Sequence, residues 1–123
     1  MKVINIEKTK NTPEILLDYE NSLLTIKGES SPENSLLFYK PVFDWLKTIT
    51  EEKDQINIKF DLDYFNTSSS KSLIDILDIA NQFYLKGNKV NFIWFYKEYD
   101  EDMLETAKEF STNLNFEFTI EKI

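Results

Sequence analysis

Hydrophobic and polar positions alternate along residues 55–65, and this pattern ends at residue 66. Such alternation is typical of a strand with one face in a core and the other in water. After residue 70 the apolar residues instead recur at helical spacing. Between the two segments, Asn66 precedes four hydroxyl residues, 67–70, and side-chain oxygens of these types cap helices. The pattern predicts a strand over 55–65 and a capped helix over about 68–85.

Apolar periodicity also predicts the other elements of the chain. They are a strand hairpin over 15–19 and 24–26, a helix over 32–49, a strand over 90–96, a helix that begins near 100 and a final strand over 116–121. The expected order is therefore β-β-α-β-α-β-α-β. Strands that alternate with helices of this length favour an α/β fold with a mixed β-sheet. Because the outward positions of the third and last strands are polar, we expect the helices mainly on one face.

The start of the first helix has two candidate caps. Ser30 with Glu33 fits a capping box, whereas Ser31 before Pro32 fits a cap followed by proline at the first helical position. Pro41 lies within the same apolar pattern and removes one helical hydrogen bond. We therefore expect either a kink in the three residues before Pro41 or a helix that starts one residue before it.

Apolar side chains occupy nearly every position of the strand over 90–96, and those from Phe92 to Tyr96 are all large. A strand with one wet face does not need so many. Either a second layer covers some of these side chains, or they form an exposed patch that marks an interface.

Composition narrows the function classes. A length of 123 residues fits a single domain over 1–123, with 1–11 as a loose end or an edge strand. The chain contains no cysteine and no histidine, so thiolate chemistry and the commonest general base are both excluded. No apolar stretch resembles a signal peptide or a membrane span, so we expect a cytoplasmic protein.

The charge of the chain opposes polyanionic partners. The net charge is −8, and all fourteen basic residues are lysine. Affinity for nucleic acid comes largely from basic side chains at phosphates, so neither nucleic acid nor an anionic membrane is an expected partner. Without arginine the chain also lacks the usual bidentate clamp for a phosphoryl group.

The sequence offers little support for a catalytic site. Asp61 with Asp63, and Asp75 with Asp78, are acidic pairs that could bind a cation or perform acid–base chemistry, but solvated carboxylates explain them as well. The two glycines, Gly28 and Gly87, form no phosphate-binding loop. We therefore expect no enzyme activity, no cofactor and no metal site.

Two separated motifs resemble one known family. The first is Asn66-Thr67-Ser68-Ser69, between a strand end and Lys71-x-Leu73. The second comprises Thr12-Pro13-x-Ile15 and the segment 28–35, followed by a helix that carries Asp44-Trp45-Leu46. Both resemble, in the same order, the SiaC-type regulatory phosphoproteins, which are small bacterial domains with a STAS-like fold. The resemblance covers about residues 11–121. Anti-sigma-factor antagonists are more distantly similar, but their Asp-Ser-Ser-Gly turn has no counterpart here.

The resemblance implies a signalling regulator rather than an enzyme. It implies Thr67 as the phosphoacceptor, with Ser68, Ser69 and Ser70 as fallback acceptors. The expected contacts with partner proteins are Asn66, Thr67, Ser68, Ser69, Ser70, Lys71, Pro32, Glu33 and Asn34. The implied partners are a Ser/Thr protein kinase of the histidine-kinase-like ATPase type, a metal-dependent Ser/Thr phosphatase, and a diguanylate cyclase that the unphosphorylated form binds and stimulates.

Two other functions fit the sequence. One is a transcription regulator that acts like an anti-sigma-factor antagonist. The other is a constitutive interaction domain that forms a homodimer through the aromatic strand and is not phosphorylated.

Overall fold

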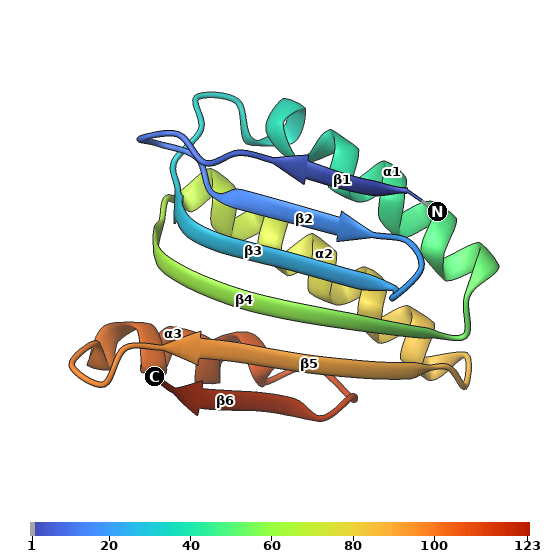
Figure 1. Ribbon diagram of the computed structural model, residues 1–123. Helices are drawn as coiled ribbons and strands as arrows, with labels where there is room; N and C mark the ends of the chain where they lie inside the picture. The colour runs from blue at the N-terminus through green and yellow to red at the C-terminus, as the bar shows by residue number, and fades with distance from the viewer. Residues whose placement is uncertain (1) are drawn as a thin grey trace.

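The computed structural model describes residues 2–123, in which six strands form one sheet in the order of the sequence (Figure 1). The strands are β1 (Val3–Ile6), β2 (Glu14–Asp18), β3 (Leu23–Ser30), β4 (Gln55–Phe65), β5 (Lys89–Tyr96) and β6 (Phe118–Lys122). β1, β2 and β3 pair antiparallel, whereas β3 to β6 pair parallel. The predicted mixed sheet is confirmed.

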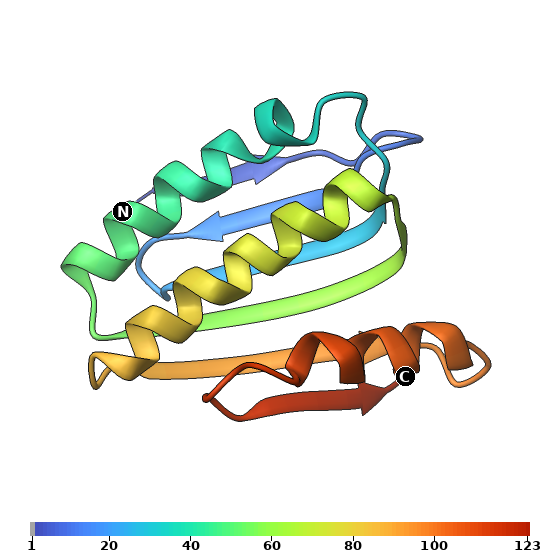
Figure 2. The same cartoon turned by 180° about the vertical axis from the view of Figure 1, so that it is seen from behind.

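Three helices connect the parallel strands: α1 (Ser35–Glu52), α2 (Thr67–Leu85) and α3 (Glu101–Ser111). All three lie on the same face of the sheet, as Figure 2 shows from behind. The prediction that the helices gather on one face is therefore confirmed. None of them is long and apolar enough to cross a bilayer.

The core lies between this face and the helices, as the alternation in β4 predicts. Ile56, Ile58, Phe60 and Leu62 are buried, whereas Lys59 between them is exposed. Successive side chains of a strand point to opposite faces of the sheet, so one face of β4 lies in the core and the other faces solvent.

β5 divides its large side chains between both faces of the sheet. Phe92 and Trp94 are buried beneath the helices, and the ring of Trp94 contacts those of Phe60, Phe65 and Phe110. Ile93 and Phe95 alternate with them toward the other face of the sheet and are only half-buried, because no helix covers that face. The apolar run is thus partly core and partly uncovered sheet surface.

The structure has one strand more than the predicted order. β1 pairs with β2 in the register Val3 to Asp18 through Ile6 to Ile15, so the observed order is β-β-β-α-β-α-β-α-β. An edge strand was one of the two alternatives for this segment. Its four residues are mostly apolar, but the run is too short to predict a strand without its neighbour.

Both predicted caps of the first helix are wrong. Asn34 is the N-cap, and its side-chain oxygen accepts a hydrogen bond from the Leu37 backbone N–H at 3.1 Å. Ser30 ends β3, and Pro32 and Glu33 precede the helix. A helix start near residue 40 is also wrong, because α1 continues through Pro41. The Leu37 carbonyl, which loses its helical donor to this proline, belongs to an exposed residue that water can reach.

Removal of the central indole should destabilise the protein strongly. For Trp94→Ala we expect the free energy of unfolding to fall by about 3–5 kcal/mol, because a fully buried side chain leaves a cavity. Urea unfolding followed by circular dichroism measures this change. Leu36→Ala is the control, because Leu36 is 70% exposed and its change should stay within about 0.5 kcal/mol. Equal losses in both variants would contradict the described core.

Candidate functional site

The two segments that the sequence singled out lie together at one edge of the sheet. The Asn66 backbone N–H donates to the Ser30 carbonyl at 3.0 Å, which joins the start of α2 to the end of β3. The Ser35 and Ser72 hydroxyls are 2.8 Å apart and join α1 to α2. Residues more than thirty positions apart in sequence therefore form one surface at the starts of α1 and α2.

Asn66 starts α2 through its side chain. Its backbone is extended, and its Oδ1 accepts hydrogen bonds from the Ser69 backbone N–H at 2.9 Å and from the Ser68 hydroxyl at 3.2 Å. The cap therefore satisfies one of the backbone donors that lack a helical partner. Helix α2 begins at Thr67, one residue earlier than predicted.

The four hydroxyl residues of this turn differ in accessibility. Thr67 and Ser68 are exposed and Ser70 is half-buried. Ser69 is fully buried, and its oxygen accepts a hydrogen bond from the Ser30 hydroxyl at 2.8 Å. Ser69 is therefore unsuited as a fallback acceptor in this conformation. Thr67 Oγ1 has no hydrogen bond to another residue within 2–123.

Beneath the exposed hydroxyls lies a chain of buried ones. The Tyr39 hydroxyl is 2.6 Å from Ser30 Oγ, which in turn bonds Ser69. Because Ser30 donates to Ser69, Tyr39 donates to Ser30. These hydrogen bonds join α1 and β3 to the first turn of α2, which begins at Thr67. Burial raises the pKa of Tyr39 to about 12, so this hydroxyl stays protonated at neutral pH.

A β-bulge sets the direction of the strand end that leads into the site. The register between β3 and β4 shifts after Gly28, whose φ of +115° few side chains tolerate. The shift leaves Asp63 without an opposite residue and places Phe65 opposite Ser30. The ring of Phe65 then packs against the core, whereas Tyr64 is 56% exposed.

A recess of about 350 Å³ separates the starts of the two helices. Its lining residues come from both segments: Glu33, Asn34, Ser35, Leu36, Ser68, Lys71 and Ser72. Of the expected contact residues, Glu33, Asn34, Ser68 and Lys71 are thus brought together, and Thr67 lies beside them on α2. Pro32 is buried and cannot present a surface to a partner, which sequence alone could not show.

The two acidic pairs, Asp61 with Asp63 and Asp75 with Asp78, do not line the recess between α1 and α2. Asp61 and Asp63 are bridged by Lys97, whose Nζ lies 3.9 and 3.4 Å from their oxygens. Asp75 is paired with Lys71 at 3.7 Å on the surface of α2. Within residues 2–123 no three carboxylates gather into a candidate metal site. Asp61, Asp63 and Asp75 therefore act as partners of lysine, and Asp78 is exposed to solvent.

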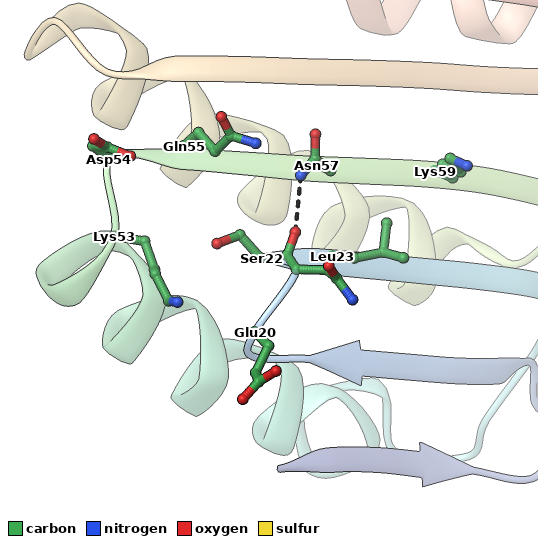
Figure 3. A pocket seen from close by; sticks show the side chains of 9 residues that line it. Glu20, Ser22, Leu23, Lys53, Asp54, Gln55, Asn57 and Lys59 are labelled. Carbon is green, nitrogen blue, oxygen red and sulfur yellow. Dashed lines mark hydrogen bonds between the residues drawn. The ribbon is translucent and has the colours of Figure 1, made fainter. Parts of the chain in front are cut away.

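A second recess of about 540 Å³ lies between the β2–β3 turn and the start of β4 (Figure 3). Its lining is polar and includes Glu20, Lys53 and Lys59. The Asn57 backbone N–H donates to the Ser22 carbonyl at 2.7 Å, which closes its floor. This recess is at the beginning of β4, whereas Thr67 follows the end of that strand.

Loss of the cap should weaken the start of α2. For Asn66→Ala we expect the free energy of unfolding to fall by about 1 kcal/mol, because the Ser69 N–H loses its acceptor. Asn66→Asp keeps an oxygen at this position and should unfold close to the native protein. Chemical unfolding of the three proteins in parallel measures the difference. An equal loss in both variants would show that the cap is not the cause.

The Tyr39 hydroxyl should give the protein a distinctive alkaline pH dependence. Because its pKa is raised from 10.0 to about 12, its stabilising effect is complete below pH 10 and is lost as the pH rises towards 12. Tyr39→Phe should be less stable by about 1 kcal/mol at pH 8, through the lost hydrogen bond. This difference should shrink between pH 10 and 12 in urea unfolding curves. A constant difference would contradict the burial of this hydroxyl.

Comparisons with known proteins place the chain in a family. A family model described as SiaC family regulatory phosphoprotein matches residues 6–123. An uncharacterized protein of Pseudomonas aeruginosa (strain UCBPP-PA14) is 33% identical over 122 residues, which cover 98% of this chain and 97% of that protein.

Solved structures from the same organism are similar over the same length. SiaC of Pseudomonas aeruginosa, in complex with the diguanylate cyclase SiaD that it activates, has a TM-score of 0.95 at 32% identity and covers 98% of this chain and 99% of its own. Apo-SiaC has a TM-score of 0.91, with the same identity and coverage. The chain therefore belongs to the SiaC family of regulatory phosphoproteins.

Proposed function

We propose that this protein is a non-catalytic signalling switch whose unphosphorylated form binds and stimulates a diguanylate cyclase, and that Thr67 is its phosphoacceptor. The observation that carries the proposal is the accessibility of Thr67. It is the first residue of α2, is exposed, and stands beside the recess between α1 and α2. The diguanylate cyclase partner of the related SiaC from Pseudomonas aeruginosa gives the proposal its partner class.

The start of α2, where Thr67 lies, can carry a phosphate without loss of the helix. The start of a helix carries a partial positive charge, so a negative group there is favourable by roughly 0.3–1 kcal/mol. Phosphorylation of Thr67 would therefore leave α2 intact. The effect of the phosphate falls on the partner instead.

The surrounding charges favour repulsion over a new internal contact. Lys71 is the one cation among the residues that line the recess, and it already pairs with Asp75 at 3.7 Å. Glu33 adds a negative charge to the same lining. A phosphate that brings a charge of about −1.5 to −2 would oppose the docking of a desolvated protein surface.

Two exposed apolar side chains make the same edge suited to protein contact. Leu36 lines the recess and is 70% exposed, and Tyr64 precedes the cap and is 56% exposed. Tyrosine is enriched among the residues that dominate interface energies, and apolar side chains are typical of the buried centre of an interface. We propose that they contact the cyclase together with Asn66, Thr67, Ser68, Ser70 and Lys71.

Two opposing enzymes complete the proposed circuit. A Ser/Thr kinase of the histidine-kinase-like ATPase type would phosphorylate Thr67, and a metal-dependent phosphatase would remove the phosphate. Both need the hydroxyl at the surface, where Thr67 lies. The whole circuit would operate in the cytoplasm, where nucleotide-dependent kinases and cyclases find their substrates.

A charge at residue 67 should separate the protein from its cyclase. We expect Thr67→Glu to weaken binding of a cognate diguanylate cyclase by about 100-fold, which corresponds to about 2.7 kcal/mol. Thr67→Ala truncates a proposed contact residue without adding charge, so it should bind within about fivefold of the native protein but should no longer accept phosphate. Isothermal titration and phosphopeptide mass spectrometry of the protein from its cells measure the two effects.

Matched variants separate this site from general charge effects. Thr112→Glu adds the same charge at an exposed position after α3 and should leave the affinity within about threefold of the native value. Ser68→Ala tests the neighbouring hydroxyl. Phosphate on Ser68 but never on Thr67 would reassign the acceptor, and unaltered cyclase binding by Thr67→Glu would refute the switch. A mass that doubles with concentration, independent of residue 67, would favour the homodimer.

A further inference from the structure

A third recess, on the helical face of the sheet, lies between α2 and the end of α3. Its volume is about 530 Å³, within the range of about 300–1,000 Å³ typical of ligand sites. The lining residues are Ile74, Asp75, Leu77, Asp78, Glu109, Phe110, Asn113 and Leu114. Because this lining comes from α2 and from the end of α3, the recess is a groove between two helices, which Figure 2 shows on the same face of the sheet. None of these residues belongs to the surface around Thr67.

The floor of the groove is apolar and firmly held. The ring of Phe110 packs edge-on against Trp94 at 5.1 Å and against Phe65 at 5.8 Å. Leu77 is almost fully buried beneath the groove. Ile74 instead keeps 49% of its surface exposed, although its neighbours on the floor pack into the core. The groove thus offers a preformed apolar floor with one side chain left uncovered.

The walls of the groove are acidic. Asp75, Asp78 and Glu109 line it, and its lining contains no basic residue. Lys71 reaches Asp75 from outside, but it is an exposed pair that contributes little. An apolar floor between carboxylates complements an apolar stripe flanked by cations. A second copy of this chain fits poorly, because its net charge is −8.

We propose that the groove between α2 and α3 binds an amphipathic helix of a partner protein, with leucine-like side chains on one face and lysine or arginine beside them. Such helices lay their apolar face into a groove through residues spaced three and four apart. The site is distinct from the surface around Thr67, since seven residues of helix place Ile74 about 10 Å along α2 from Thr67. It therefore gives the protein a second contact surface that does not depend on the proposed switch.

A designed peptide tests the groove. The probe is a fluorescent 16-residue helix with four leucines on one face and lysines on its flanks, titrated into the full chain and followed by polarisation and by amide NMR shifts. We expect saturable binding that shifts the amides of 74–78 and 109–114. A matched peptide with glutamate in place of lysine should bind at least about tenfold more weakly.

Charge-matched variants exclude simple attraction to an acidic protein. Ile74→Asp adds a negative charge but removes the uncovered floor residue, so peptide affinity should fall about tenfold. Leu85→Asp adds the same charge to an apolar residue that is 56% exposed on the same helix, and it should bind as the native protein does. Asp78→Asn with Glu109→Gln should weaken binding and flatten its salt dependence.

Four results would overturn the proposal. The first three are equal affinities for the lysine and glutamate peptides, equal affinities for Ile74→Asp and Leu85→Asp, and amide shifts that lie outside 74–78 and 109–114. The fourth is a dimer that Ile74→Asp converts to a monomer, which would assign the groove to a second copy. Thr67→Glu should change peptide affinity by less than about threefold, because the charge lies about a Debye length away. Failure of the groove and failure of the switch are therefore separable.

Discussion

The site depends on the joint between the end of β3 and the start of α2. The Asn66 backbone N–H bonds the Ser30 carbonyl at 3.0 Å, and the Ser30 side chain bonds the buried Ser69 at 2.8 Å. The backbone bond fixes where the strand stops, and the side-chain bond fixes how the first turn of the helix is rotated. With Ser69 turned inward, Thr67 and Ser68 are turned outward. The exposure of the proposed acceptor is thus a consequence of the burial of its neighbour.

The buried hydroxyls also explain why the two helix starts act as one surface. Tyr39 from α1 reaches the same Ser30, and Ser35 from α1 bonds Ser72 from α2. Hydroxyl groups in a dry interior must find partners, so each of these bonds is costly to break. The positions of α1 and α2 are therefore coupled by polar bonds at the end where a partner is proposed to dock, and by apolar packing along their length.

Local pattern predicted the strand and helix on either side of Asn66, because alternation and helical spacing need no knowledge of the rest of the chain. It failed at the cap of α1, where Ser30, Ser31 and Asn34 are all good capping residues. The choice fell to Asn34 because Ser30 is used by the sheet and the hydroxyl chain. Tertiary contacts of this kind also bury Ser69 and Pro32, which local pattern placed at the surface. The groove between α2 and α3 had no sequence signal, since its two sets of lining residues, 74–78 and 109–114, are more than thirty positions apart.

The sheet order has a consequence for how the chain assembles. Each strand lies next to the strand that precedes it, from β1 to β6, so no strand has to enter between two that are already paired. Each new strand can therefore pair with the free edge of the existing sheet as it leaves the ribosome, in the order of synthesis. The last unit to join, α3 with β6, completes one wall of the groove and covers Trp94 through Phe110 and Phe118. A chain interrupted before residue 100 would lack that cover, and its aromatic core would be open to water and to proteases.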